Sequence, residues 1–353
     1  MRIAVMPFFK LEPSSVITRL PPILLASILH HCRFADHYYV ITDYDKVCFK
    51  DLFSVVGEKV TIVRLDEVIS SATRLVIDKL VSLWSSGIAI ANHPPSEKLC
   101  FLRWFAIRDW LNTLDSDASC HYLLHDWDDL AFRDPYESLE ELRVYMNIEN
   151  LDVASFTEVG LCQWMQPNLT FFSKNSIYDY CNTVEYFVDE LGCMRSLNLK
   201  DKGFLDDCLP WAYLINRYRA FGDGIFVNLL FGGMENRKAR FNGFRLYFNT
   251  TVRTPEDFDK INFKIPKEFD YTEDKMGLVE LLRLDVFDGK VQARNAGEDR
   301  WYQLVNIHFT GVESKYAFLN GYLCNLRDYY TYNAELAHSL QACGLGCFFG
   351  LGK

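Results

Sequence analysis

The chain alternates short apolar runs with longer segments whose apolar residues recur every three or four positions. The short runs, rich in aromatic and β-branched residues, predict buried strands at 2–6, 37–41, 60–65, 122–124, 152–156, 169–173 and 302–309. The longer segments predict helices at 22–32, 66–84, 97–111, 138–146, 176–191 and 207–218. This mixture of strands and helices predicts a fold of the α/β class.

The pattern weakens between residues 221 and 299, where short β-like runs alternate with charged loops. No internal repeat or low-complexity linker interrupts the chain. We therefore expect one continuous domain over residues 1–320 with a less regular C-terminal part. A C-terminal helix and a tail rich in Gly and Phe, residues 321–353, are expected to dock on it.

Composition and charge narrow the possible partners. The chain has 353 residues, 49% of them hydrophobic, which is ample material for a core. Its formal net charge is -10, and an acidic surface repels phosphate backbones, so nucleic-acid binding is not expected. A nucleotide ligand would need a metal ion or a local group of Arg and Lys.

Cysteines and apolar stretches bear on compartment. The eleven cysteines are scattered without a pair of CxxC motifs, which disfavours a structural zinc site and predicts free thiols in a reducing compartment. The apolar run at residues 1–6 is too short for a signal peptide, and no stretch reaches the length of a transmembrane helix. We expect a cytoplasmic protein.

The most informative stretch is 122–132, where an apolar run is followed by Asp126, Asp128 and Asp129. Open α/β sheets bind ligands at the carboxyl ends of their strands. If the backbone is extended there, Asp126 and Asp128 point the same way and repel each other unless a cation lies between them. Mg²⁺ or Mn²⁺ would suit such oxygen ligands. The alternative is a solvated acidic turn.

Two further features lie later in the chain. Asp206 and Asp207 precede the expected helix at 207–218, where they could simply favour the helix dipole. His308, Gly311 and Lys315 follow the late apolar strand; alone they would be a core histidine, a turn and a surface lysine.

Two arginines on the helix before the acidic stretch are also candidates. Arg103 and Arg108 lie on the expected helix at 97–111, either as salt-bridged surface residues or as ligand contacts.

Taken in this order, these features resemble the GT-A glycosyltransferases, which use nucleotide-sugar donors. The resemblance covers residues 1 to about 316 and implies a mostly parallel central sheet flanked by helices. Residues 126–130 resemble the DxD motif of that family. His308, Gly311 and Lys315 resemble its C-terminal His-x-x-Gly-x-x-Lys element, with one extra residue before the lysine.

The resemblance implies a role for each residue. Asp126, Asp128 and His308 would hold the ion, and an imidazole suits Mn²⁺ better than Mg²⁺. Asp126 could instead lean toward the ribose. Gly311 would form a turn at the diphosphate, and Lys315 and Arg103 would be its cationic partners. Gln166 and Asn168 would line the donor-sugar pocket. Asp206 or Asp207 would be the general base. Trp127 and Trp164 could stack on sugar faces or belong to the core.

The function expected from these observations is metal-dependent transfer of a hexose from a nucleoside-diphosphate sugar, UDP-glucose first, to a glycan or protein acceptor, with inversion. A retaining enzyme would need no Asp base. A cytosolic enzyme of a bacterium or a large DNA virus fits the expected absence of a membrane anchor. The alternatives are a nucleotidyltransferase or metal-dependent phosphohydrolase, and a non-catalytic carbohydrate-binding protein. Residues 7–10 contain no glycine for a phosphate loop, which disfavours the nucleotidyltransferase.

Overall fold

The fold is described from a computed structural model of the chain. The structure describes residues 1–10, 20–85, 94–114, 121–146, 153–157, 169–189, 226–230, 245–247, 282–295, 301–309 and 318–352.

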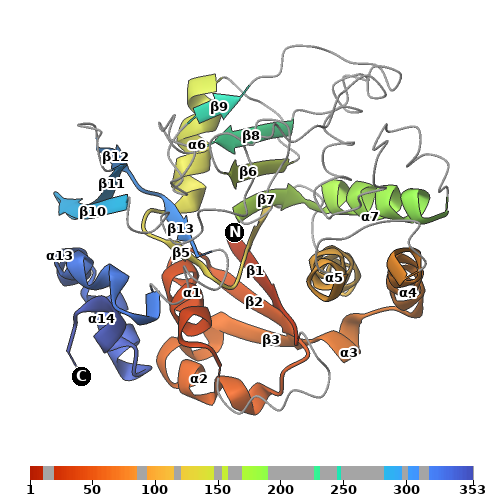
Figure 1. Ribbon diagram of the computed structural model, residues 1–353, viewed down its shortest axis with the longest axis horizontal. Coiled ribbons are helices and arrows are strands. Elements are labelled where there is room, and N and C mark those ends of the chain that lie inside the picture. Colours follow the sequence, from red (N-terminus) through yellow and green to blue (C-terminus); the bar gives the residue numbers. More distant parts are fainter. Residues whose placement is uncertain are drawn as a thin grey trace.

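A mixed sheet forms the centre of the molecule, with strands in the order β3-β2-β1-β4-β7-β6-β8-β9 (Figure 1). Four of its seven strand pairings, β1–β2, β1–β4, β2–β3 and β6–β8, are parallel. The predicted α/β fold with a mostly parallel central sheet is therefore confirmed. The strands are β1 (Ile3–Phe8), β2 (His37–Thr42), β3 (Val60–Arg64), β4 (His121–His125), β6 (Val153–Thr157), β7 (Leu169–Ser173), β8 (Phe226–Leu230) and β9 (Arg245–Tyr247).

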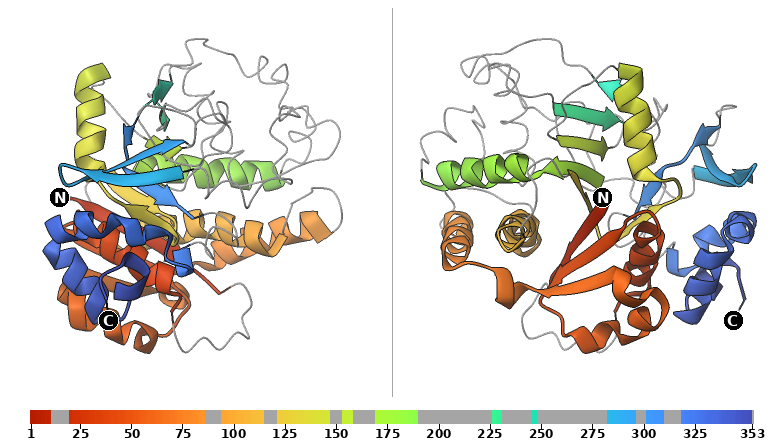
Figure 2. Two further views of the ribbon diagram at one scale, coloured as in Figure 1. Left: turned by 60° about the vertical axis from the view of Figure 1, so that its left-hand side comes forward. Right: turned by 180° about the vertical axis from the view of Figure 1, so that it is seen from behind.

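Helices cover both faces of the neighbouring strands β3, β2, β1, β4 and β7. In Figures 1 and 2, α4 and α5 lie to one side of β1, and α1 with the C-terminal helices lies to the other. The α-helices are α1 (Pro22–Cys32), α2 (Lys50–Val56), α3 (Leu65–Val68), α4 (Ser71–Ser85), α5 (Pro94–Leu111), α6 (Pro135–Met146), α7 (Lys174–Asp189), α13 (Arg327–Tyr332) and α14 (Ala334–Ala342). Short 3-10 helices are η1 (Lys46–Phe49), η2 (Gly57–Lys59), η4 (Tyr322–Leu326) and η5 (Gly346–Phe349).

The alternation of side chains along β1 divides the core into two layers. Ala4 and Met6 pack with α1 and the C-terminal helices, whereas Ile3 and Val5 pack with α4, α5 and α7. Successive residues of a strand point to opposite faces of its sheet. Because both faces of β1 are covered, the strand is apolar throughout, as expected for a buried parallel strand.

Two small sheets accompany the central one. The antiparallel pair β5 (Asp129–Ala131) and β13 (Asn306–His308) joins the middle of the chain to its late part. A three-stranded sheet consists of β10 (Leu282–Phe287), β11 (Lys290–Asn295) and β12 (Tyr302–Gln303). The hairpin β10–β11 gives regular structure to part of the segment in which the sequence pattern is weak.

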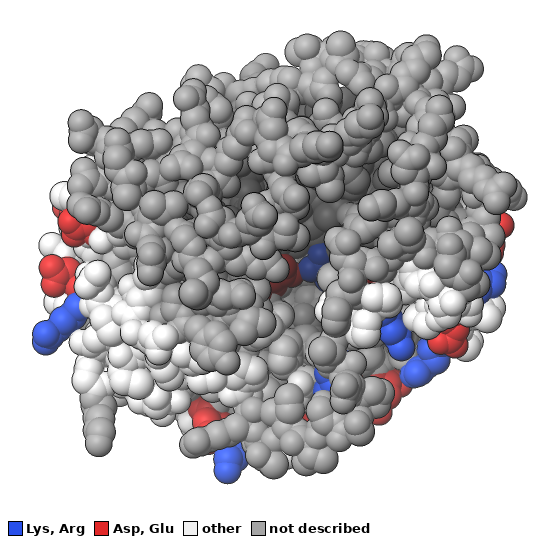
Figure 3. All heavy atoms as spheres, viewed as in Figure 1, with Lys and Arg blue, Asp and Glu red and all other residues white. Residues whose placement is uncertain are grey.

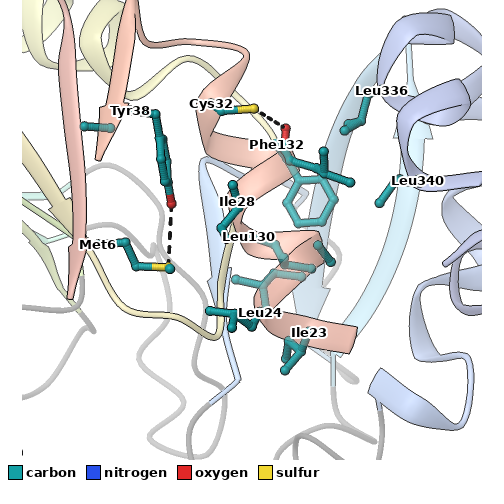
Figure 4. Close-up of a cluster of buried hydrophobic side chains, with 14 of the residues drawn as sticks. Met6, Ile23, Leu24, Ile28, Cys32, Tyr38, Leu130, Phe132, Leu336 and Leu340 are labelled. Atoms are coloured by element: carbon teal, nitrogen blue, oxygen red, sulfur yellow. Dashed lines mark hydrogen bonds between the residues drawn. The ribbon is translucent and has the colours of Figure 1, made fainter. Parts of the chain in front are cut away.

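The C-terminal segment packs against α1. Figure 4 shows α1 between the strand side, with Met6 and Tyr38, and α14, with Leu336 and Leu340. Arg33 at the end of α1 donates to the carbonyl of Ala131 at 3.0 Å and to the Tyr329 hydroxyl. This contact joins β5, α1 and α13.

Two predicted elements are divided in the structure. The helix expected at 66–84 is interrupted, because the backbone is extended at Ile69 and the Ser70 hydroxyl accepts from the Thr73 amide at 3.1 Å, which caps a new helix, α4. The strand expected at 302–309 is divided into β12 and β13, which pair with different partners.

We expect the two leucines of α4 to differ sharply in their contribution to stability. Leu80 is fully buried in the core that α4 shares with α5 and α7, and Leu75 is 58% exposed. Leu80→Ala should lower the free energy of unfolding by roughly 2–5 kcal/mol, because it leaves a cavity. Leu75→Ala, the matched control, should change it by about 0.5 kcal/mol or less. Urea denaturation measures both, and equal losses would contradict this packing.

Candidate functional site

The acidic stretch lies at the carboxyl end of β4, beside the parallel strand β1. From the sequence we expected an extended backbone at residues 126–128, and the structure shows that it is not extended there. Trp127 and Asp128 form a turn, and the Asp129 amide donates to the Asp126 carbonyl at 3.2 Å. A turn brings the two carboxylates to one side as effectively as an extended backbone, so the correction concerns the backbone and not their proximity.

Three side chains meet at this turn. His308 Nε2 lies 3.2 Å from Asp128 Oδ1 and 3.4 Å from Asp126 Oδ2. One ligand atom from each residue lies within 4.8 Å of the others. The pairing of β13 with β5 delivers the imidazole, since His308 is opposite Asp129, and the Phe309 amide donates to the Asp128 carbonyl at 2.9 Å.

The spacing of these atoms suits a divalent ion. Adjacent ligands of an octahedral ion with bonds of about 2.1 Å are about 3 Å apart, close to the separations of His308 Nε2 from the two carboxylate oxygens. Two carboxylates and one imidazole form a donor set that accepts Mn²⁺ readily and Mg²⁺ less readily. The residues therefore fit the ion that the sequence predicts.

Positive charge is favoured at this position. Burial lowers the pKa of the His308 imidazole, but the Asp128 and Asp126 carboxylates outweigh burial and raise it to about 9. Arg103 on α5 donates from Nη1 to Asp126 Oδ1 at 2.6 Å. Asp126 thus presents one oxygen to a guanidinium and the other to the imidazole.

A second group of side chains, fully buried, lies directly behind the turn. Asp129 Oδ1 shares a hydrogen bond of 2.9 Å with His31 Nε2, and the Asn306 amide donates to Asp129 Oδ2. Burial raises the pKa of Asp129 to about 8 and lowers that of His31 to about 3. Burial therefore favours the neutral form of both groups.

His31 lies on α1, and a second residue of this helix bonds to the backbone next to the turn. The Ser27 hydroxyl donates to the Asp129 carbonyl at 2.6 Å. The His31 ring stacks on the His125 ring, with centroids 3.7 Å apart, and His125 Nε2 shares a hydrogen bond of 2.6 Å with the Tyr38 hydroxyl. These contacts connect the turn to α1 and to β2.

The other predicted residues are distributed differently. Arg108 bonds Glu185 at 2.6 Å and Thr73 at 2.9 Å, which makes it part of the packing of α4, α5 and α7. Trp127 lies 5.4 Å from Phe8, ring to ring, at the edge of the core. Six predicted site residues and Trp164 lie outside the described residues: Asp206, Asp207, Gln166, Asn168, Gly311 and Lys315.

The buried group of Asp129, His31 and Asn306 was not predicted from the sequence. His31 belongs to a pair of histidines in a mostly apolar helix. Asn306 precedes His308 by two residues, so Asn306 and His308 share one face of a strand. Polar residues at buried positions need partners, and this was the available signal. It could not identify the partners, because Asn306 and Asp129 are 177 residues apart.

No protein-family model matches the sequence, and no curated protein matches it either. Several solved structures resemble this one distantly. Mouse xyloside xylosyltransferase 1 in its apo form superposes with a TM-score of 0.41 at 11% identity, over 65% of this chain and 85% of that one. The glycosyltransferase GlyE of Streptococcus pneumoniae TIGR4 has a TM-score of 0.34 at 12% identity, over 67% of this chain and 45% of that one.

A third likeness is to the bifunctional IspDF of Campylobacter jejuni, with a TM-score of 0.30 at 8% identity, over 65% of this chain and 49% of that one. This chain thus spans less than half of the second and third proteins. At such TM-scores these likenesses carry no argument for an activity, which has to rest on the site itself.

The described part of the surface carries charges of both signs. In Figure 3, acidic and basic side chains are interspersed along the described part of one face. Among the described helices, none is both long and apolar enough to cross a membrane.

Proposed function

We propose that the protein is a metal-dependent glycosyltransferase that moves a hexose from a nucleoside-diphosphate sugar to a glycan or protein acceptor. The observation that carries this proposal is the meeting of Asp126, Asp128 and His308 at the carboxyl end of a central strand. Ligands bind at such strand ends in open α/β sheets. The fold, taken alone, would not support an activity.

In this proposal Asp126, Asp128 and His308 hold Mn²⁺ or Mg²⁺, with Mn²⁺ preferred because one ligand is an imidazole. The bound ion would supply positive charge beside the diphosphate leaving group. Arg103 is proposed to add a second positive charge there, and its hydrogen bond of 2.6 Å from Nη1 to Asp126 Oδ1 supports this role. Gly311 and Lys315, which follow β13 in the sequence, are proposed to approach the same diphosphate.

The transfer itself would be a displacement with inversion. The acceptor hydroxyl oxygen bonds to the anomeric carbon, and the bond from that carbon to the diphosphate oxygen breaks. The hydroxyl proton passes to the carboxylate of Asp206 or Asp207. Gln166 and Asn168 are proposed to line the sugar pocket. The register of β7 supports this, because Leu169, the residue after Asn168, pairs with His125, the residue before Asp126.

The division into a catalytic domain at 1–320 and a docking C-terminal part at 321–353 is also a proposal. Its support is the contact of α14 with α1. Leu336 and Leu340 of α14 lie in the same core cluster as Leu24 and Ile28 of α1.

A thermal-shift panel of nucleotide sugars, each with and without Mn²⁺, tests the proposed function. One donor, with UDP-glucose tested first, should stabilise the protein only when Mn²⁺ is present. At 100 times its Kd the gain would be about 2.7 kcal/mol. Stabilisation by nucleoside triphosphates or phosphate monoesters instead would favour the nucleotidyltransferase or phosphohydrolase class. Stabilisation by free glycans without Mn²⁺, and no donor hydrolysis, would favour a binding protein.

A further inference from the structure

The strand pair that completes the site is short. β5 and β13 share three residue pairs, Asn306 with Ala131, Ile307 with Leu130 and His308 with Asp129, and neither strand belongs to the central sheet. A slip of one residue in a strand turns every side chain to the opposite face. Such a slip of β13 would point His308 away from Asp126 and Asp128, so the ion site depends on this register.

One side-chain contact crosses the pair diagonally. Asn306 is opposite Ala131 in the ladder, yet its amide reaches the carboxyl of Asp129, which is opposite His308. This bond can form only when β13 lies in the observed register. Both side chains are fully buried, so water cannot easily replace it.

A third residue fixes the acceptor of that bond. His31 Nε2 holds the other oxygen of Asp129 at 2.9 Å, and Ser27, one turn earlier on α1, holds the Asp129 carbonyl at 2.6 Å. The Asp129 carboxyl thus has one oxygen bound to α1 and the other bound to β13. Its orientation is determined by a helix that belongs to the main core.

We propose that Asn306, Asp129 and His31 form a register clamp: they are positioning residues that keep His308 facing Asp126 and Asp128 before any ion arrives. This inference rests on the metal site of the proposed function. It extends that proposal to residues that do not touch the ion, and it makes α1 the reference to which the imidazole is aligned. Removing a group that orients a metal ligand commonly changes metal affinity 10–100-fold, and we expect an effect of that size for the clamp, which acts on His308 through the pairing of β13 with β5.

The test measures Mn²⁺ binding by the full chain and the coupling of the Mn²⁺ electron spin to an imidazole ¹⁴N by pulsed electron paramagnetic resonance. Wild type should bind Mn²⁺ and show the ¹⁴N coupling of His308. Asn306→Ala should bind Mn²⁺ about 10–100-fold more weakly and lose the ¹⁴N coupling, because the two carboxylates remain and the imidazole is no longer aligned. His31→Leu keeps the space filled and should change Mn²⁺ affinity and ¹⁴N coupling in the same direction. It serves as the test if Asn306→Ala does not fold.

Two further variants separate alignment from general stability. Asp129→Asn should retain affinity and coupling, because an amide can accept from Asn306 and donate to the His31 ring. Thr73→Val removes a buried hydrogen bond of 2.7 Å to Asp109, far along the chain from the site. It should lower stability in urea and leave Mn²⁺ affinity and ¹⁴N coupling unchanged.

The outcomes distinguish this inference from the function beneath it. A wild type without Mn²⁺ binding or ¹⁴N coupling overturns the metal site and the clamp together. The clamp alone is overturned if wild type binds Mn²⁺ and shows the ¹⁴N coupling, and the folded Asn306→Ala and His31→Leu proteins do so too. Their Mn²⁺ affinity would then lie within about threefold of wild type, well below the change expected from the clamp.

Discussion

Asp128→Asn is expected to abolish Mn²⁺-dependent donor binding and activity. The change keeps the volume of the side chain and removes one of the two negative charges beside His308. Loss of an outer partner already costs 10–100-fold in metal affinity, so loss of a direct ligand should cost more than about 100-fold. The protein itself should still fold, because an isosteric change at the site edge opens no cavity.

Isothermal titration with Mn²⁺, followed by donor, measures this effect. Asp328→Asn is the matched control, since it makes the same change of charge at an exposed position on α13. It should bind Mn²⁺ and donor like wild type. A folded Asp128→Asn protein with unchanged Mn²⁺-dependent donor binding would refute the assignment of this metal site.

The second large effect concerns the general base. One of the two variants Asp206→Asn and Asp207→Asn should lower turnover by about 10²–10⁴-fold, the usual contribution of a positioned base. Donor binding in the presence of Mn²⁺ should stay unchanged, because the base acts on the acceptor hydroxyl and not on the donor. The other variant should retain most activity.

Initial rates at saturating donor, together with the donor Kd, distinguish this role from a structural one. The configuration of the product at the anomeric carbon, read by nuclear magnetic resonance, gives an independent check. If both variants turn over at the wild-type rate, or the product retains configuration, the assignment of an Asp base is wrong and these residues need another explanation.

The elements that could be predicted from sequence are those whose signals are local. α1 begins at Pro22 and ends at Cys32 as expected, because a proline at the first helical position is followed by an apolar run. β7 coincides with its predicted range for a similar reason, since all five of its residues are buried.

The elements that escaped prediction depend on distant partners. β5 has three residues and begins with an aspartate, so its sequence resembles the continuation of an acidic loop. What makes it a strand is pairing with β13, and what makes a buried aspartate tolerable is its contact with His31 and Asn306. Neither partner can be found from the residues around Asp129.

Some contacts of the candidate site could likewise be predicted from the sequence, and others depend on the fold. The spacing of the acidic residues and the strand before His308 suggested which groups could share an ion, and the structure brings those three groups together. The pairing of Arg103 with Asp126 depends on the orientation of α5 above β4, and sequence periodicity leaves that orientation undetermined.

The pairing of β5 with β13 also sets the order in which the molecule can be completed. A ribosome that has released residues 1–300 has already produced the sheet strands β1 to β4, both carboxylates of the turn and His31. The nascent chain still lacks Asn306 and His308, so it presents an acidic turn with no imidazole opposite it. Closing so long an interval in the chain costs entropy that grows only slowly with its length. Asn306 and His308 emerge after the two carboxylates and His31, and their arrival therefore converts an acidic turn into the pocket that we propose for the ion.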